Sequence, residues 1–248
     1  MQASSVAVII PARFQSSRFP GKPLALIAGT SLIQRVWGRC VAAVDPSLVF
    51  VATDDERIAS HCRDFDAQVI LTSPDCLTGT DRIAEVARQI EADVYINVQG
   101  DEPLVHADDI LKVIDAFRGN PESVVCAMCP IESADEFISL TVPKVVVRED
   151  GRLLYMSRAG IPGNKSGTFA VGMKQVCIYA FSKVHLAHFS SYPKKTPLEQ
   201  LEDIEILRFL ETGVPVQMIP VSGSSLAVDT PEDIWRVEAR LQNSGERS

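Results

Sequence analysis

The chain has 248 residues, of which 46% are apolar and 23% charged, which is typical of a soluble globular protein with a substantial core. Its net charge of −8 argues against general nucleic-acid binding, because most of the surface would repel a phosphate backbone. No apolar stretch approaches membrane-spanning length and no basic segment precedes an apolar one at the N-terminus, so we expect a cytoplasmic protein with neither a membrane nor a nucleic acid as partner.

Short Val/Ile-rich runs alternate with longer amphipathic segments through the first half of the chain. They predict strands at 6–12, 48–53, 67–72 and 94–99, and helices at 30–43, 54–65, 79–90 and 107–119. Strands and helices in this alternation indicate an α/β fold with a doubly wound, mostly parallel sheet. A ligand of such a sheet binds outside the carboxyl ends of the strands.

The regular alternation of predicted strands and helices ends at about residue 122. Strands are predicted in "SVVCAMCPI", "PKVVVRE", "VCIYAFS" and "VQMIPV", with one helix over 197–213 and a last helix from residue 230. We therefore expect a nucleotide-binding part at 1–121, a smaller mixed α+β lobe at 122–220, and a return to the main sheet at 221–248.

Six cysteines are scattered along the chain, and only Cys126 and Cys129 form a C-x-x-C. This pair lies inside an apolar run that predicts a buried strand, and the second Cys/His pair of a structural zinc site is missing from the sequence. We expect reduced cysteines in the core.

A basic, Pro/Gly-rich loop follows the first strand, in "VIIPARFQSSRFPGKPL". Arg13 and Lys22 supply charge, while Gly21, Ser16 and Ser17 let backbone amides approach a phosphate. The loop matches neither G-x-x-x-x-G-K-[ST] nor G-x-G-x-x-G, which disfavours an ATPase or a dinucleotide dehydrogenase. It predicts a different phosphate-binding loop, and the alternative is a solvated basic turn.

Two carboxylates are placed to bind a metal ion. Asp101 ends the strand in "VYINVQGDEPLV", and Asp229 precedes a helix whose Thr230 and Asp233 resemble a capping box. Mg²⁺ typically takes one or two carboxylates together with phosphate oxygens, so the pair predicts a nucleotide-bound Mg²⁺. The alternative for Asp101 is an ordinary turn residue. The small residues of 77–82 open another helix at the same edge and could pack against a flat base.

Six stretches in order resemble one known family: "IIPARFQSSRFPGKPL", "VATDDERI", "TSPDCLTGTDRIAEV", "YINVQGDEPLV", "YMSRAGIP" and "VDTPEDI". Together they are similar to 3-deoxy-manno-octulosonate (Kdo) cytidylyltransferases, over about residues 6–240. The resemblance implies a nucleotide-binding, glycosyltransferase-A-like fold, and a homodimer formed through the second lobe. It implies that the anomeric hydroxyl of an acidic sugar attacks the α-phosphate of CTP, giving a CMP-sugar and pyrophosphate.

The resemblance also assigns site residues. Implied catalytic residues are Lys22, Arg13 and Asp101, and implied Mg²⁺ ligands are Asp101 and Asp229. Implied nucleotide-binding residues are Ala12, Arg13, Lys22, Thr78, Gly79 and Gln99. Implied acceptor-binding residues are Arg158, Gln175, Tyr179 and Glu205, with Arg158 meeting the sugar acid.

The chain departs from the family pattern in the acceptor half. Gln175 and Cys177 stand where the family usually has His and Gly, and Ile206 stands where it has Gln beside Glu205. The segment after Arg158 is also unlike the usual one. These departures leave open a different acceptor acid, such as 8-amino-Kdo, another ulosonic acid or a small phosphonate.

A catalytically silent nucleotide-binding or regulatory protein is the alternative from another class. The cations of the phosphate loop and both metal carboxylates are present, and a silent relative has no need of the carboxylate pair. Release of pyrophosphate from CTP distinguishes the two classes.

Overall fold

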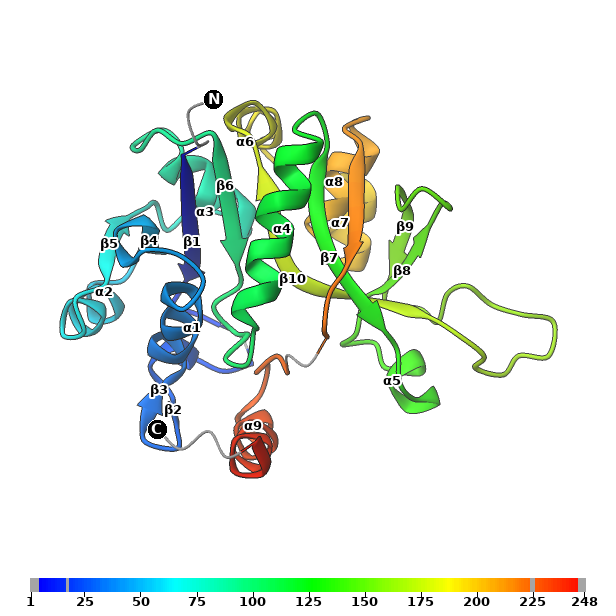
Figure 1. Ribbon diagram of the computed structural model, residues 1–248, viewed down its shortest axis with the longest axis horizontal. Coiled ribbons are helices and arrows are strands. Elements are labelled where there is room, and N and C mark those ends of the chain that lie inside the picture. The colour runs from blue at the N-terminus through cyan, green and yellow to red at the C-terminus, as the bar shows by residue number, and fades with distance from the viewer. Residues whose placement is uncertain (1–4, 17, 224–225, 245–248) are drawn as a thin grey trace.

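The computed structural model describes residues 5–16, 18–223 and 226–244; Ser17, expected in the phosphate loop, lies outside them. Nine strands of this described chain form one sheet with the order β11–β7–β10–β6–β1–β4–β5, to which β8 and β9 attach at β10 (Figure 1). The strands are β1 Val6–Ala12, β4 Val49–Thr53, β5 Gln68–Leu71, β6 Val94–Val98, β7 Val124–Pro130, β8 Lys144–Val147, β9 Leu153–Ser157, β10 Met173–Phe181 and β11 Val216–Pro220, with the short pair β2 Leu26–Ile27 and β3 Thr30–Ser31 apart.

The sheet is mostly parallel, as the sequence predicts. Strands β6, β1, β4 and β5 are mutually parallel, and so are β7 and β11. Strand β10 runs antiparallel to both of its neighbours in the sheet, β6 and β7. The carboxyl ends of β1, β4 and β6 therefore lie at one edge, where the predicted loops meet.

Helices cover both faces of the sheet (Figure 1). They are α1 Leu32–Val41, α2 Glu56–Arg63, α3 Gly79–Val86, α4 Ala107–Gly119, α5 Ala134–Ile138, α6 Lys183–Ser190, α7 Pro197–Glu202, α8 Ile206–Glu211 and α9 Pro231–Ser244. Because side chains of a strand alternate between faces, Val8 and Ile10 of β1 pack in one apolar cluster with α1, α2, α4 and α9. Ala7 and Ile9 pack in the other, with α3, α6 and α8. This is the doubly wound arrangement.

The predicted single helix over 197–213 is wrong, because it is broken into α7 and α8. Asp203 adopts a left-handed conformation with φ of 52°. Arg158 reaches this break: its Nε donates to the Glu202 carbonyl at 2.5 Å and its Nη2 to the Asp203 carbonyl at 3.0 Å. Carbonyls that a continuous helix would use internally thus bind a side chain that is far away in the sequence. The sequence patterns also missed α5, β9 and α6.

The predicted lobe is only partly separate from the sheet. Strands β7, β10 and β11 of residues 122–220 belong to the main sheet, whereas α5, the β8–β9 pair and the segment 158–172 extend beyond it, to the right in Figure 1. A buried Lys144 ties this extension together, since its Nζ donates to the carbonyls of Ser139, Val142 and Arg158. Desolvation lowers the pKa of Lys144. The division at 122 and 220 remains a prediction.

Two smaller expectations concern the cysteines and the membrane. Cys126 and Cys129 are buried in β7, as predicted. All six cysteines are free thiols, although Cys76 and Cys177 are only partly buried. Within the described ranges, no helix has the length and apolar character that crossing a bilayer requires.

Candidate nucleotide and metal site

A backbone hydrogen bond closes the loop after β1. The Gly21 amide donates to the Phe14 carbonyl at 2.8 Å, and Gly21 has φ of 73°, a conformation that favours glycine. A Cβ at Gly21 would lie 3.2 Å from the Phe14 ring, which also carries the Arg57 guanidinium 3.3 Å from its centroid. A short 3₁₀ helix, Lys22–Leu24, begins directly after this turn.

A cavity at the carboxyl edge of the sheet gathers all residues assigned to nucleotide or metal binding. They are Ala12, Arg13, Lys22, Thr78, Gly79, Gln99, Asp101 and Asp229, and Ser16 lines it as well. They come from the ends of β1 and β6, the start of α3 and the segment before α9. The structure therefore brings together residues as far apart as 12 and 229 in the sequence.

The Lys22 ammonium lies between the two predicted metal carboxylates. Its Nζ is 2.9 Å from Asp101 Oδ2 and 3.9 Å from Asp229 Oδ1. It also donates to the Val228 carbonyl at 2.7 Å, and the Val228 amide donates to the Asp101 carbonyl at 2.9 Å. Arg18 Nη2 is 3.2 Å from Asp229 Oδ1. These contacts dock the segment before α9 against the end of β6, so the two carboxylates converge.

This donor set fits Mg²⁺ bound together with a nucleotide. Two carboxylates that both contact one ammonium group can both face one small hard cation, and Mg²⁺ usually completes its shell with phosphate oxygens and water. Among the described residues no group of three or more His, Cys, Asp or Glu side chains could hold a metal without such a substrate.

The N-terminus of α3 forms another wall of the cavity. Thr78 caps the helix in a reciprocal capping box: its Oγ1 accepts from the Asp81 amide at 3.2 Å, and Asp81 Oδ2 accepts from the Thr78 amide at 3.0 Å. Gly79 follows, and a Cβ there would lie 2.9 Å from Gln99 Nε2. A larger residue at this position would displace the Gln99 amide, which lies against the helix start. The helix dipole at this start favours anions.

Sequence reasoning missed Arg82 as a cavity residue. Its guanidinium is nearly buried, lies 3.4 Å from Asp54 Oδ1 and contacts the Thr72 hydroxyl. The usable signal was its spacing, since Arg82 follows Thr78 by four residues and therefore lies on the same side of α3. Cys76 also lines the cavity, and burial raises the pKa of its thiol to about 12, so it remains protonated at neutral pH.

Comparison with known proteins decides the family. The family model described as cytidylyltransferase matches residues 7–219. The chain belongs to the cytidylyltransferase family. It is 40% identical over 247 residues to the 3-deoxy-manno-octulosonate cytidylyltransferase of Myxococcus xanthus (strain DK1622), covering 99% of this chain and 100% of that protein. It is 38% identical to the Escherichia coli protein of the same name, with 96% of each chain covered.

Solved structures agree with this assignment. A structure described as CMP:2-keto-3-deoxy-manno-octonic acid synthetase complexed with CTP superposes with a TM-score of 0.89 at 37% identity, covering 97% of this chain and 100% of that one. The resemblance drawn from six sequence stretches is thereby confirmed, and so is the α/β fold with its large, mostly parallel sheet.

The predicted acceptor residues are not among the residues that line the cavity. Of the described residues that line it, none is Arg158, Gln175, Tyr179 or Glu205. Arg158 donates to the carbonyls of Glu202, Asp203 and Leu140. Each of its guanidinium nitrogens thus binds a backbone carbonyl, and whether Arg158 meets the sugar acid remains a prediction.

Gln175 and Tyr179 form a pair on β10, where Gln175 Nε2 donates to the Tyr179 hydroxyl at 3.0 Å. Burial raises the pKa of Tyr179 well above its ordinary value. Ile206, the other departure from the family pattern, is fully buried in the apolar cluster beneath the sheet. Its side chain therefore contributes packing rather than a polar contact.

Glu205 contacts the cavity indirectly. Its carboxylate accepts from the Thr80 amide at 3.0 Å and from Gln99 Nε2 at 2.8 Å. Desolvation raises its pKa, although the Thr80 amide opposes that shift. Of the four predicted acceptor residues, Glu205 is the one bonded to a residue of the cavity wall.

Proposed function

We propose that this protein transfers CMP from CTP to the anomeric hydroxyl of Kdo and releases pyrophosphate. The observation that carries the proposal is the convergence of Lys22, Asp101 and Asp229 in one cavity with the phosphate loop. The name shared by relatives about 40% identical over nearly the whole chain supplies the substrates.

The chemistry follows from the cavity. The anomeric oxygen of Kdo forms a bond to the α-phosphorus of CTP, and the bond from that phosphorus to the bridging oxygen of pyrophosphate breaks. Such transfers depend on positioning and charge neutralisation rather than on a protein nucleophile. Arg13 and Lys22 supply cations on one wall, and the N-terminus of α3 supplies partial positive charge on another.

We propose further that Asp101 and Asp229 hold Mg²⁺ with the nucleotide. The ion would supply Lewis-acid stabilisation of the charge that develops on the phosphate oxygens. The chain's own contribution is to keep both carboxylates at one point, through the Val228–Asp101 backbone hydrogen bond and the Lys22 contacts.

The test is pyrophosphate release from CTP and Mg²⁺ with Kdo, compared with 8-amino-Kdo, another ulosonic acid and a small phosphonate. We expect release that requires an acceptor and is highest with Kdo. Strong preference for another acid would retain the cytidylyl transfer and replace the acceptor. No release with any acid would favour the silent nucleotide-binding alternative.

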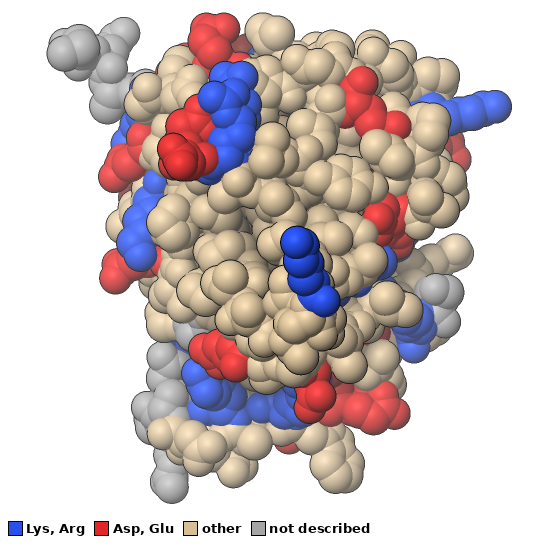
Figure 2. Space-filling view, turned by 90° about the vertical axis from the view of Figure 1, so that its right-hand side faces the viewer, with Lys and Arg blue, Asp and Glu red and all other residues tan. Residues whose placement is uncertain are grey.

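We also propose that the protein is a homodimer that pairs through the lobe. Exposed apolar side chains gather on α5, β9, α7 and the segments beside them: Ile138, Leu140, Leu154, Val171 and Leu201, which are 53–80% exposed. Figure 2 shows this side of the molecule as a broad face on which uncharged side chains predominate, with a basic side chain near its centre and other charged side chains around it. Large exposed apolar areas mark interaction sites.

Sedimentation equilibrium tests the dimer proposal. We expect twice the chain mass for the wild type and a shift toward monomer for Leu154→Asp. Leu111→Asp on α4, an exposed leucine away from the lobe, is the matched control and should stay dimeric. A monomeric wild type would overturn the proposal.

A further inference from the structure

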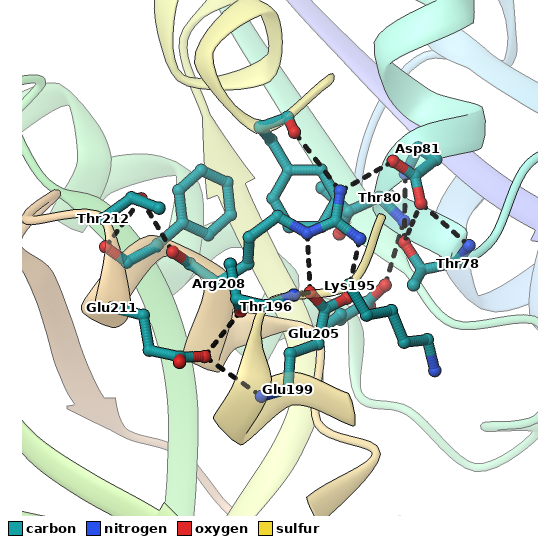
Figure 3. A network of polar contacts seen from close by, with 12 residues as sticks. Thr78, Thr80, Asp81, Lys195, Thr196, Glu199, Glu205, Arg208, Glu211 and Thr212 are labelled. Atoms are coloured by element: carbon teal, nitrogen blue, oxygen red, sulfur yellow. Dashed lines mark hydrogen bonds and ion pairs between the residues drawn. The ribbon is translucent and has the colours of Figure 1, made fainter. Parts of the chain in front are cut away.

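Glu205 lies where the break between α7 and α8 meets the start of α3 (Figure 3). One oxygen of its carboxylate accepts from the Thr80 amide at 3.0 Å, and the other accepts from Gln99 Nε2 at 2.8 Å. Thr80 is fully buried, and Gln99 lines the nucleotide cavity. A single carboxylate thus joins a helix cap to a side chain of the cavity wall.

These bonds determine the orientation of the Gln99 amide. A backbone N–H can only donate, and an ionised carboxylate can only accept. Glu205 therefore accepts on both oxygens, and Gln99 must turn its NH₂ end toward Glu205. One N–H of the NH₂ group is thereby engaged. Oε1, which a carboxylate cannot bond, is left as the acceptor that the amide can offer to a ligand in the cavity. Gly79 permits this arrangement, because a Cβ there would lie 2.9 Å from Gln99 Nε2.

The support for Glu205 is rigid. Arg208, three residues later, pairs with both oxygens of Glu199 at 2.7 Å each and with Asp81 Oδ1 at 3.0 Å (Figure 3). Its guanidinium also lies 3.7 Å from the centroid of the Phe189 ring. Arg208 and Glu199 are fully buried. The start of α8 is therefore fastened to the capping box of α3 independently of Glu205.

We propose that Glu205 is a positioning residue that orients the Gln99 amide, so that Gln99 Oε1 offers bound substrates a hydrogen-bond acceptor at this point of the cavity. The substrate group that meets Gln99 Oε1 is then a donor, an amino or a hydroxyl group. This inference rests on the proposed function and assigns Glu205 a role through Gln99, without direct contact with the acceptor acid.

Glu205→Gln tests the proposal because it keeps the cap and inverts the amide. The Thr80 N–H still requires an acceptor, so the new side chain offers it a carbonyl and turns its NH₂ toward Gln99. Gln99 must then present Oε1 to that NH₂ and Nε2 to the cavity. We expect kcat/KM to fall about tenfold to a hundredfold, the size expected for one misplaced buried hydrogen bond.

The reciprocal exchange supplies the decisive comparison. Gln99→Glu alone places two carboxylates against each other and should also lose activity. In the double variant Glu205→Gln with Gln99→Glu, the amide at 205 donates to the carboxylate at 99, and a carboxylate oxygen again faces the cavity. We expect kcat/KM of the double variant to exceed that of both single variants by about tenfold.

Glu211→Gln is the matched control. Glu211 accepts from the amides of Leu198 and Glu199 at 3.0 and 3.1 Å, so it too caps a helix with a carboxylate, but its bonds do not reach the cavity wall. We expect a lower Tm with kcat/KM near the wild-type value. This variant measures what a purely structural loss does to activity.

The outcomes are distinct. Loss in Glu205→Gln with recovery in the double variant supports the proposal. The proposal is overturned if Glu205→Gln keeps the wild-type kcat/KM. It is also overturned if the double variant is folded, as shown by cooperative melting, and its kcat/KM does not exceed that of the single variants. Should Glu205→Gln fail to fold, Gln99→Glu and its rescue by the second substitution decide the question. Wild-type activity with CTP and Kdo is measured first, so a failure of the proposed function would be seen separately.

Discussion

Two regions of the molecule are organised differently. The strand-end region consists of the residues that line the cavity. The lobe region consists of residues 131–172 and the break between α7 and α8. In the strand-end region, cations and carboxylates follow directly after strands and face a common space. In the lobe region, cations are used for the backbone: Lys144 and Arg158 bind carbonyls at a turn and at a helix break. Charged side chains thus line a cavity in the first region, whereas Lys144 and Arg158 bind the backbone in the second.

This difference predicts where a lost charge affects activity and where it affects stability. Arg13, Asp101 and Asp229 should be replaceable without loss of the fold, because they line a cavity. Lys144 and Arg158 should not, because their removal leaves backbone carbonyls without donors.

The largest expected effect belongs to the carboxylates. Asp101→Asn or Asp229→Asn should lower activity by orders of magnitude in a folded protein, as would excess EDTA. Pyrophosphate release and thermal melting are the measurements. Asp115→Asn, on an exposed carboxylate of α4, is the control. Full activity in excess EDTA would contradict the metal assignment.

The next largest effect belongs to the phosphate-loop cations. Arg13→Ala or Lys22→Ala should weaken CTP use and slow turnover by at least about tenfold, with little change in the apparent affinity for the acid. Steady-state kinetics with each substrate varied separates the two, and Lys183→Ala, on an exposed lysine paired with Glu91, is the control. If these variants changed only the KM for the acid, the loop would bind the acid rather than CTP.

The lobe region gives the contrasting prediction. Arg158→Ala should lower the free energy of unfolding by about 1–3 kcal/mol, because the carbonyls of Glu202 and Asp203 lose their donors. Urea unfolding measures it, and Arg148→Ala, on an exposed arginine paired with Asp150, should change little. If Arg158→Ala left the free energy of unfolding unchanged and raised only the KM for Kdo, Arg158 would contact the acceptor substrate. The two regions would then not differ in how they use charge.

The smallest expected effect concerns a single methyl group. Gly79→Ala should displace the Gln99 amide and raise KM for CTP a few-fold, with Tm unchanged or higher because alanine favours helix by about 1 kcal/mol. Gly38→Ala in α1, where a Cβ meets no atom within 4 Å, should raise Tm alone. Equal kinetics of the two variants would show that Gln99 is free to move.

The strand-end region could be predicted because its information is local. A strand such as Val6–Ala12 is buried along its whole length and is followed at once by the loop that bears Arg13, so periodicity and composition place both. The parallel order then brings Asp101 beside that loop. Only the approach of Asp229 needed the fold, since the Val228–Asp101 hydrogen bond joins segments far apart in sequence.

The lobe region could not be predicted in the same way because its information is long-range. Residues 197–213 have a helical pattern, and the carbonyls at the break are bound by Arg158, about forty-five residues earlier. The role of Glu205 likewise depends on Thr80 and Gln99, each more than a hundred residues away. Helical periodicity carries no signal for such partners.

A crystal structure with CTP and Mn²⁺ in place of Mg²⁺, in which anomalous scattering locates the metal, tests whether Asp101 and Asp229 hold the metal of a bound nucleotide. We expect an anomalous peak in contact with both carboxylates, and the triphosphate against Arg13, Lys22 and the start of α3. A metal held by neither carboxylate, or CTP bound outside this cavity, would show that the site is assigned wrongly.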